Sequence, residues 1–292
     1  MKSSDIAKYL GKELIGEDIQ IDSFSSLNNL SPRSIVFAKK YKTEYVEVLN
    51  GARDVLAIVT DEYGGRLSIP YIVSANPRLD FLKVVAKFFP VEEVKPGIHK
   101  TSVIDDGATI GKNVIIGSHC YIGSQVTIGD DTIILPNVSI YSKVRIGSGC
   151  YIKPGAVIGG PGFGFEFDEN DVPVHFPHTG EVIIGNNVYI GANTSIDRAT
   201  IDATIIEDDV KIDDLVHVAH NCHIGKNTLI TGGAMLGGGV KIGRNSWIAP
   251  NSTILQQLKI GDNAKVGIGS VVLRNVKDKT VVFGIPAKKS DF

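Results

Sequence analysis

Residues 104–158 read IDDGATIGKNVIIGSHCYIGSQVTIGDDTIILPNVSIYSKVRIGSGCYIKPGAVI, and an isoleucine stands at every sixth position without a slip. The register resumes at Ile184 and, after a shift of four residues near Asp202, continues from Ile206 to Val272. A period of six fits neither the 3.6-residue period of a helix nor plain strand alternation, but it is the hexapeptide repeat of a parallel β-helix. Three hexapeptides form one coil, so we predict a left-handed, three-sided β-helix with about 18 residues per coil.

The repeat also predicts the environment of each position. The aliphatic residue should point into a narrow interior and stack on its equivalents in neighbouring coils. The residue two positions earlier should also face inward and be small, and Cys120, Cys150 and Cys222 occupy this slot. We therefore interpret the cysteines as small buried hydrophobic residues rather than nucleophiles or metal ligands. Glycines after the aliphatic position, such as Gly111 and Gly117, are expected to supply the permissive backbone that corners need.

Residues 1–98 lack the repeat and predict a small α/β domain. Its expected elements are a helix through Leu10 capped by Ser3 or Ser4 with Asp5, buried strands at 55–59 and 71–74, and a helix that Asn76 and Pro77 open and that ends near Pro90. The β-helix is predicted over residues 99–273, followed by a C-terminal tail at 274–292. Residues 159–183 interrupt the coils, and an insertion of this length is expected to form a loop on the functional face.

Composition narrows the possible functions. Thirty Lys and Arg residues against 32 Asp and Glu residues give a formal net charge of −2, so no global positive field exists to hold nucleic acid. The N-terminal sequence MKSSDIAKYLGKELIGED has no apolar leader, and the chain has no run of 18 uninterrupted apolar residues. We therefore expect a cytoplasmic protein that spans no membrane and binds no nucleic acid.

Three of the seven histidines fall within seven residues, at His217, His220 and His223. His217 and His223 directly precede inward aliphatic residues and should point outward, whereas His220 lies two residues after Val218, at a corner. Its neighbour one coil later is Gly238, the middle of three consecutive glycines. Bare backbone N–H groups beside an imidazole suit a developing oxyanion, so we predict that a general base and an oxyanion donor share this corner.

Two other functions are compatible with a hexapeptide β-helix. Some such proteins are trimeric zinc carbonic anhydrases with three imidazole ligands. However, His217 and His223 should lie on different faces of the prism, so their side chains diverge and we expect no metal site. The second alternative is a purely structural or binding protein, which a failure to bind an acyl donor or a nucleotide sugar would indicate.

Several segments carry a resemblance to a known enzyme family. They are GANTSIDRATIDATIIEDDVKIDD (191–214), VHVAHNCHIG (216–225), the insertion GFGFEFDENDVPVHFPHTGEVIIG (162–185), SLNNLSPRSIVFAKKY (26–41) and NPRLDFLKVVAKFF (76–89). With them the chain resembles the UDP-3-O-acylglucosamine N-acyltransferases of lipid A biosynthesis over nearly its whole length. The resemblance implies a homotrimer without a permanently bound cofactor. It also implies transfer of a 3-hydroxyacyl group from acyl carrier protein to the 2-amine of a UDP-linked glucosamine.

The resemblance assigns roles to individual residues. The family's catalytic histidine falls on His220, its backbone oxyanion donor on Gly238, and its active-site aspartate on Asp213, which is expected to orient or stabilise the imidazole. Substrate contacts are also expected. These are Phe37 with either Tyr41 or Tyr45, on which the family stacks uracil, together with His217, Asp214 and Gln257.

Some positions depart from the family pattern. Asp214 replaces an asparagine, and Gln257 stands where the family has a second active-site histidine. The ending VVFGIPAKKSDF (281–292) is similar to the tail of coenzyme A-dependent hexapeptide transferases, in which this loop packs over the donor. The acyl-thioester donor is thus expected to be acyl carrier protein or coenzyme A. The alternative function is an acyl-CoA-dependent N-acyltransferase acting on another nucleotide-linked amino sugar, such as a dideoxy sugar for surface polysaccharide.

Overall fold

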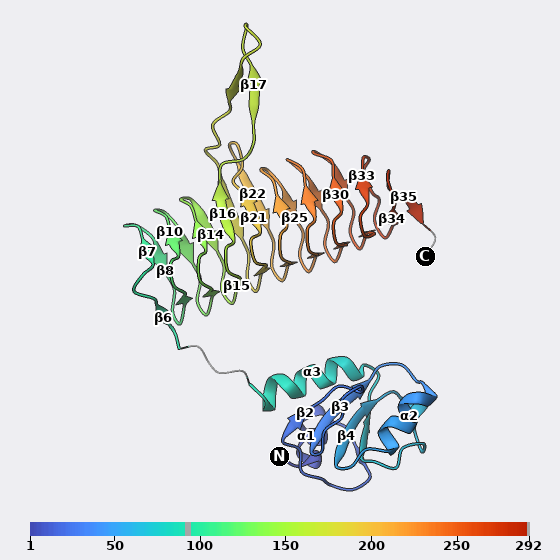
Figure 1. Ribbon diagram of the computed structural model, residues 1–292. Helices are drawn as coiled ribbons and strands as arrows, with labels where there is room; N and C mark the ends of the chain where they lie inside the picture. The colour runs from blue at the N-terminus through green and yellow to red at the C-terminus, as the bar shows by residue number, and fades with distance from the viewer. Residues whose placement is uncertain (91–94, 291–292) are drawn as a thin grey trace. The chain divides into compact units, whose positions relative to one another are not determined.

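The computed structural model describes residues 1–90 and 95–290, which form two compact units, Met1–Glu93 and Val94–Phe292 (Figure 1). Residues 91–94 of the predicted N-terminal domain and residues 291–292 of the predicted tail lie outside the described residues. Strand β6 (Gly97–Ile98) already pairs with β9 (Ile115–Ile116), so the β-helix begins two residues before its predicted start. Within the described ranges, no helix has the length and apolar character needed to cross a membrane.

The first unit is built on a five-stranded sheet in the order β1-β5-β4-β3-β2. β1 is antiparallel to its neighbour and the other pairs are parallel. The strands are β1 Leu14–Ile15, β2 Ser23–Phe24, β3 Ser34–Ala38, β4 Val55–Val59 and β5 Tyr71–Val73. Every residue of β4 is buried, as expected of a central parallel strand with both faces covered. The strands predicted near residues 55–59 and 71–74 are therefore confirmed.

Helices cover both faces of this sheet. They are α1 Ser3–Leu10, α2 Thr43–Asn50 and α3 Pro77–Phe88, with a 3-10 turn η1 at Asp61–Tyr63. Ile6 of α1 and Val84 of α3 are buried in one cluster with Ile58 of β4, whereas Leu49 of α2 is buried in another with Ala57. Because successive residues of a strand point to opposite faces, α2 lies across the sheet from α1 and α3.

The two predicted helix starts had different outcomes. The side chain of Asn76 accepts a hydrogen bond from the backbone N–H of Leu79 at 3.3 Å, so the predicted cap of α3 is confirmed. The predicted cap of α1 is correct only for Asp5, whose carboxylate accepts from the backbone N–H of Lys2 at 3.1 Å, because Lys2 rather than Ser3 or Ser4 is the N-cap residue. The hydroxyls of Ser3 and Ser4 instead donate to the carboxylate of Asp18, which ties the helix to the following loop.

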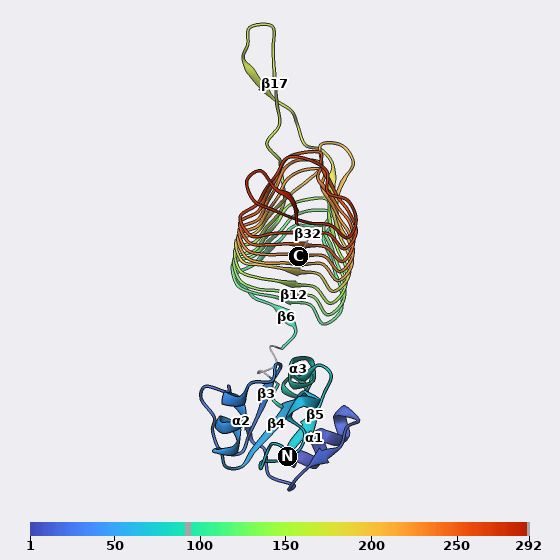
Figure 2. The same cartoon turned by 90° about the vertical axis from the view of Figure 1, so that its right-hand side faces the viewer.

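The second unit is a left-handed parallel β-helix whose coils superpose in Figure 2. Its three sheets are named here after β24, β25 and β26. The β24 sheet contains β7 Val103–Ile104, β10 Tyr121–Ile122, β13 Ser139–Ile140, β16 Val157–Gly160, β21 Ser195–Asp197, β24 His217–Val218, β27 Met235–Leu236, β30 Thr253–Ile254 and β33 Val271–Val272. The β25 sheet contains β8 Thr109–Ile110, β11 Thr127–Ile128, β14 Val144–Ile146, β19 Glu181–Ile184, β22 Ala203–Ile206, β25 His223–Ile224, β28 Lys241–Ile242 and β31 Lys259–Ile260. Besides β6 and β9, the β26 sheet contains β12 Ile133–Ile134, β15 Tyr151–Ile152, β20 Tyr189–Ile190, β23 Lys211–Ile212, β26 Leu229–Ile230, β29 Trp247–Ile248, β32 Lys265–Val266, β34 Val281–Phe283 and β35 Lys288–Ser290.

The hexapeptide register is that predicted from the sequence. Ile122 pairs with Ile104 and Ile140, each 18 residues away, and the repeated aliphatic side chains form one continuous core. Full burial of each such side chain contributes about 1.5–3 kcal/mol. Cys120, Cys150 and Cys222 are buried free thiols in the neighbouring slot, as predicted.

The role predicted for the corner glycines is wrong. Gly111 and Gly117 do not have positive φ. Instead, a Cβ at Gly111 would lie 2.5 Å from the side chain of Asp130, and one at Gly117 would lie 2.6 Å from the backbone of Pro136. These glycines are needed because the next coil passes too close for any side chain. The left-handed conformation is found two residues later, for example at Asn113, where φ is 56°.

The insertion forms a hairpin that projects from the β-helix (Figure 1). Its strands, β17 Phe165–Phe167 and β18 Pro173–His175, are antiparallel. Arg198 holds the base of the hairpin, because its Nε donates to the carbonyl of Gly159 at 2.7 Å and its Nη2 donates to the carbonyl of Ser142 at 3.0 Å. The predicted tail does not leave the fold at once, since β34 extends the β26 sheet and β35 folds back on it.

Candidate active site

His220 and Gly238 are vertical neighbours at the corner between the β24 and β25 sheets. A Cβ added at Gly238 would lie 2.7 Å from both Cε1 and Nε2 of His220, so the imidazole rests on the glycine backbone. The N–H of Gly239 donates to the carbonyl of His220 at 2.8 Å, which ties the two coils together here. The contact expected from the 18-residue coil is therefore present, and only glycine permits it.

The backbone N–H of Gly238 is the free donor among three consecutive glycines. The N–H of Gly237 donates to the carbonyl of Ile254 at 3.0 Å, and that of Gly239 donates to His220. The N–H of Gly238 has no acceptor within residues 1–90 and 95–290. A partly exposed, unpaired N–H beside an imidazole has the geometry of an oxyanion donor.

Asn221 determines which nitrogen of His220 carries the proton. Oδ1 of Asn221 accepts from the backbone N–H of Thr200 at 3.2 Å and from its hydroxyl at 3.1 Å. Because an N–H can only donate, this contact identifies the atom as the oxygen. Nδ1 of His220 lies 2.8 Å from the same oxygen and must therefore carry the hydrogen. Nε2 is left as the basic nitrogen of the neutral ring.

The carboxylate near His220 is Asp197, which the sequence analysis did not single out. It ends β21, one coil before β24, and its Oδ2 lies 3.8 Å from Nε2 of His217. Burial raises the pKa of the Asp197 carboxyl, and the adjacent His217 and His220 oppose this rise. Asp197 belongs to the SIDR segment of the sequence (195–198). Counting 18 residues does not place it beside residues 217–220, because extra residues follow β21.

Asp213 and Asp214 lie at a different edge of the same chain. They follow β23, between the β26 and β24 sheets, and Asp213 accepts from the N–H of Gly232 at 3.2 Å without contacting His220 in the described structure. The oxygens of Asp214 lie 2.7 and 2.8 Å from Nζ of Lys153. The hydrogen bond from Lys153 lowers the pKa of Asp214. The orienting role predicted for Asp213 therefore has no counterpart within one chain.

The other two histidines of the cluster point to separate partners. Nδ1 of His217 lies 2.7 Å from the hydroxyl of Ser195 on the β24 sheet. Nε2 of His223 lies 2.8 Å from the carboxylate of Glu207 beside the β25 sheet. The imidazoles thus diverge, as predicted. Across the part of the chain that the structure describes, no three His, Cys, Asp or Glu side chains are arranged to hold a metal ion.

Gln257 occupies the same edge as His220, two coils further along. Its backbone N–H donates to the carbonyl of Gly238 at 2.8 Å, and the residue is exposed. A substrate placed against His220 and Gly238 therefore lies near Gln257, whereas Asp213 and Asp214 are on another edge.

Phe37 shares a cavity with one of the two predicted tyrosines, although its own ring packs on Phe81 of α3, with 5.0 Å between the centroids. Phe37 and Tyr45 line a cavity of about 350 Å³ together with Lys39, Lys40 and Lys42. The ammonium of Lys42 lies 5.0 Å from the centroid of the Tyr45 ring. The geometry favours Tyr45 over Tyr41 as the partner of Phe37.

Tyr41 is engaged elsewhere in the same unit. Its ring packs edge-on against Tyr63, with 5.1 Å between centroids, and the guanidinium of Arg66 lies 5.3 Å from its centroid. Tyr41 also belongs to the hydrophobic cluster beneath α2, so its role in this structure is packing.

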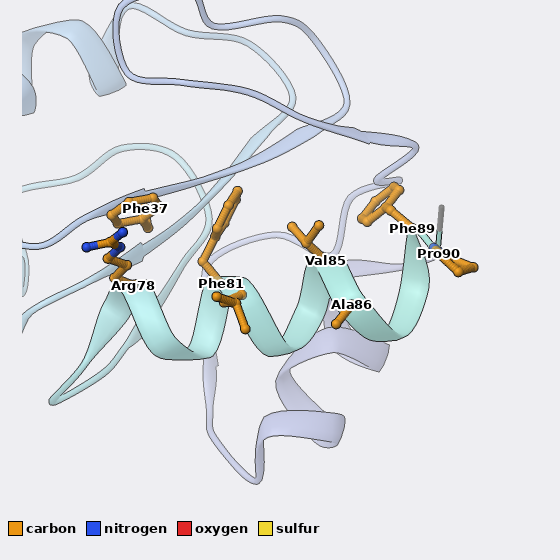
Figure 3. Close-up of a pocket in the computed structure, with 8 residues that line it drawn as sticks. Phe37, Arg78, Phe81, Val85, Ala86, Phe89 and Pro90 are labelled. Carbon is orange, nitrogen blue, oxygen red and sulfur yellow. The ribbon is translucent and has the colours of Figure 1, made fainter. Parts of the chain in front are cut away.

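A second, larger cavity of about 630 Å³ also borders Phe37 (Figure 3). It runs along α3, where Phe81, Val85 and Phe89 form an apolar row and Arg78 lies beside Phe37 at one end. Sequence analysis identified α3 but not this groove, although the apolar residues of NPRLDFLKVVAKFF outnumber those needed for one buried face.

Residues 95–129, 125–160, 203–238 and 239–276 match the family described as bacterial transferase hexapeptide (six repeats). Residues 181–213 match the hexapeptide repeat of succinyl-transferase. These matches span more than half of the 292 residues. The chain belongs to the bacterial hexapeptide-repeat transferases.

Two curated relatives of this hexapeptide-repeat transferase carry the same name. UDP-3-O-acylglucosamine N-acyltransferase from Coxiella burnetii (strain RSA 493 / Nine Mile phase I) is 33% identical over 71% of this chain and 66% of its own length. The enzyme of that name from Pseudomonas syringae pv. tomato is 32% identical over 72% of this chain and 65% of its own length. The chain thus spans slightly less than two thirds of these relatives. The resemblance identified from the sequence motifs is confirmed.

Solved structures support the same fold. LpxA from Acinetobacter baumannii is 30% identical with a TM-score of 0.61, over 66% of this chain and 73% of that one. UDP-N-acetylglucosamine O-acyltransferase from Moraxella catarrhalis is 26% identical with a TM-score of 0.60, over the same shares of the two chains. The left-handed hexapeptide β-helix predicted from the sequence is therefore confirmed.

Proposed function

We propose that this protein is an N-acyltransferase of lipid A biosynthesis. It moves a 3-hydroxyacyl group from a phosphopantetheine thioester to the amine of a UDP-linked glucosamine derivative. The observation that carries the proposal is the corner where His220 rests on Gly238, with the free N–H of Gly238 and the basic Nε2 of His220 side by side. The shared name of the curated relatives supplies the substrate class.

The corner can perform direct acyl transfer. Nε2 of His220 takes a proton from the amine as the amine nitrogen attacks the thioester carbonyl carbon and a C–N bond forms, a contribution of about 10²–10⁴ in rate. The carbonyl oxygen becomes an oxyanion and accepts a hydrogen bond from Gly238, worth about 3 kcal/mol. The C–S bond then breaks, and the imidazolium of His220 returns the proton to the leaving thiolate. The products are an amide and a free thiol.

Charge near the imidazole supports this sequence of steps. His220 becomes a cation in the tetrahedral intermediate, and an anion nearby stabilises that cation. Asp197 is a partly buried carboxylate close enough to interact electrostatically with both His217 and His220. We assign to Asp197 the stabilising role that the resemblance gave to Asp213.

The cavity of Phe37 and Tyr45 suits a nucleotide. An aromatic pair can stack on the uracil ring, and Lys39, Lys40 and Lys42 provide positive charge for the diphosphate. The N-terminal unit would then bind the nucleotide of the sugar acceptor.

The phosphate of the acyl-thioester donor would bind near a second group of lysines. A cavity of about 490 Å³ on the β25 sheet, the sheet that begins beyond the His220 corner, is lined by three lysines and two aspartates, Lys241, Lys259, Lys277, Asp262 and Asp278. These three lysines form no ion pair with any residue in the described ranges. Acyl carrier protein and coenzyme A both present a phosphate on the pantetheine arm. We favour the carrier protein because the curated relatives share the lipid A enzyme's name.

One structural feature supports the alternative function, in which coenzyme A is the donor. Residues 281–290 turn back on the last coils, and the N–H of Ala287 donates to the carbonyl of Val271 at 2.8 Å. The PAK-containing tail thus packs on the β-helix, as expected if it covers coenzyme A. In that case the acceptor would be another nucleotide-linked amino sugar.

The proposal includes a cytoplasmic homotrimer. On the β26 sheet the rings of Tyr151 and Tyr189 stack with 5.4 Å between centroids, and Leu229 and Trp247 are 44% and 46% exposed in the same outward column. Lys211 separates Tyr189 from Leu229 in this column, so the column presents two apolar patches that are suited to burial against another copy of the chain.

An acyl-transfer assay with crossed substrates tests the proposal. The donors are 3-hydroxyacyl carrier protein and acyl-CoA, and the acceptors are UDP- and dTDP-linked amino sugars. We expect activity with the carrier protein and a UDP-linked glucosamine, and loss of activity in His220→Ala. Activity restricted to acyl-CoA and a dTDP-linked sugar would instead support the alternative function, and activity with no pair would contradict both.

A further inference from the structure

His178 is a buried histidine that the mechanism above does not use. It lies at the end of the insertion and is 7% exposed. Its Nδ1 lies 2.9 Å from the carbonyl oxygen of Phe176, which can only accept, so Nδ1 carries the hydrogen. Nε2 is then an acceptor, and it is buried without a hydrogen-bond partner in the described part of the chain. Such a group costs about 1–3 kcal/mol unless a ligand pairs with it.

The rings of His178 and His220 lie side by side. Their centroids are 5.0 Å apart and the ring planes meet at 67°. A Cβ added at Gly162 would lie 2.9 Å from Nε2 of His178 and 3.0 Å from Cδ2 of His220, so both rings border one point in space. The unpaired acceptor therefore faces the region of the proposed base.

His178 is suited to accept rather than donate. Burial, and secondarily the neighbouring His220, lower the pKa of His178, so the ring stays neutral and Nε2 keeps its lone pair. Gly162 covers this nitrogen in the absence of substrate, and a Cβ at Gly164 would also lie 2.9 Å from the His178 ring. Substrate contact with His178 therefore requires the segment from Gly162 to Gly164 to move aside.

We propose that Nε2 of His178 accepts a hydrogen bond from the reacting amine and thereby selects an amine over a hydroxyl as the nucleophile. The inference rests on the proposed function. An amine can donate one hydrogen to His220 and a second to His178. Two hydrogen bonds of about 3 Å from one tetrahedral nitrogen place the two acceptor atoms about 5 Å apart, and rings whose centroids are 5.0 Å apart are close enough for one nitrogen to reach both. A hydroxyl has one hydrogen and leaves His178 unpaired, which a polar site penalises strongly.

The fold makes such a selection necessary. The solved Moraxella catarrhalis protein is named an O-acyltransferase, whereas the curated relatives are named N-acyltransferases. The base and the oxyanion donor alone serve an amine or a hydroxyl equally, because either nucleophile has a proton to give to the base. A second acceptor beside the base is the simplest device that separates them.

Matched substrates and variants test the proposal. UDP-glucosamine and UDP-glucose differ in the amine or hydroxyl at one carbon, and their Kd values are compared by calorimetry. His178→Phe removes both ring nitrogens but keeps a ring, and His178→Gln keeps an acceptor. We expect tighter binding of UDP-glucosamine by the wild type, and loss of that preference in H178F. Its kcat/KM for the amine should fall by about 10- to 100-fold, with most of the loss restored in H178Q.

The possible outcomes separate this inference from the proposed function. An H178F protein that retains the amine preference and kcat/KM overturns the inference and leaves the function intact. A wild-type protein that acylates no nucleotide-linked amino sugar overturns both. If H178F does not fold, ¹⁵N-histidine NMR of the wild type decides. A shift of the His178 Nε2 signal with UDP-glucosamine but not with UDP-glucose supports the inference, and an equal response or none overturns it.

Discussion

Nδ1 of His220 lies 2.8 Å from Oδ1 of Asn221, and the donors of Thr200 hold that oxygen in place from the preceding coil. The contact makes an asparagine, rather than a carboxylate, the group that sets the tautomer of the proposed base. An amide carries no charge, so it orients the imidazole but stabilises its protonated form less than a carboxylate would. Orientation and charge are thus divided between Asn221 and Asp197.

The first prediction concerns Asn221. Asn221→Ala should lower kcat at least about 10-fold. The imidazole of His220 loses the acceptor that orients it, so a large fraction of the molecules carry the hydrogen on Nε2 instead of Nδ1. Asn221 has a φ of 61°, so alanine also adds backbone strain. Asn227→Ala is the matched control, since Asn227 has a φ of 60° at another corner. Equal loss of kcat in both variants, measured beside their unfolding midpoints, would contradict the assignment.

The second prediction concerns Gly238. In Gly238→Ala the new methyl group would lie 2.7 Å from the imidazole of His220 and push it from its position. We expect kcat to fall by about 10²–10³, with little change in the unfolding midpoint, because φ at Gly238 is not positive. Gly51→Ala, whose Cβ would meet its nearest neighbour at 3.4 Å, should leave kcat unchanged. Retention of wild-type kcat in G238A would refute the contact.

The third prediction follows from the raised pKa of Asp197. Between the unfolded value, near 3.8, and the raised folded value, the folded protein binds more protons, so this group makes stability fall as pH rises. Asp197→Asn should therefore raise the unfolding midpoint relative to the wild type at pH 7, and the difference should disappear toward pH 4. The same variant should lose activity because the imidazolium loses its anion. A difference in unfolding midpoint that is independent of pH would argue against a raised pKa of Asp197 in the folded protein.

The fourth prediction distinguishes the two tyrosines. Tyr45→Ala should weaken binding of a UDP-sugar by about 10-fold through loss of stacking, whereas Tyr45→Phe should bind nearly as well as the wild type. Tyr41→Ala should leave the Kd of the folded protein unchanged, since Tyr41 packs on Tyr63. Calorimetric titration with UDP measures all three. The opposite ranking of Tyr41 and Tyr45 would assign the stacking on uracil to Tyr41.

The fifth prediction concerns the thiols. Burial raises the pKa of Cys222 to about 12 and raises those of Cys120 and Cys150. All three should resist a thiol reagent at pH 8 in the folded protein and react once it is unfolded. Spectrophotometric titration of free thiols checks this, and rapid modification of the folded protein without loss of structure would contradict it.

Periodicity determined much of the architecture and one contact of the site. Identical aliphatic residues at six-residue intervals can bury their side chains only by stacking coil upon coil, so the three faces and the 18-residue step follow from the sequence. That step alone places Gly238 beside His220. The arithmetic holds there because no residue is inserted between positions 203 and 273 to disturb the register.

The rest of the site depended on tertiary structure. The insertion and the extra residues after β21 break the register, so counting could not place His178, Asp197 or Thr200 near His220. The aspartate expected there, Asp213, came from the family resemblance. The corner glycines show the same limit, because the close passage of the next coil, rather than the φ angle, excludes a side chain. A repeat specifies what lies one period away. Contacts made by segments that leave the repeat depend on how those segments fold back, which only three-dimensional packing determines.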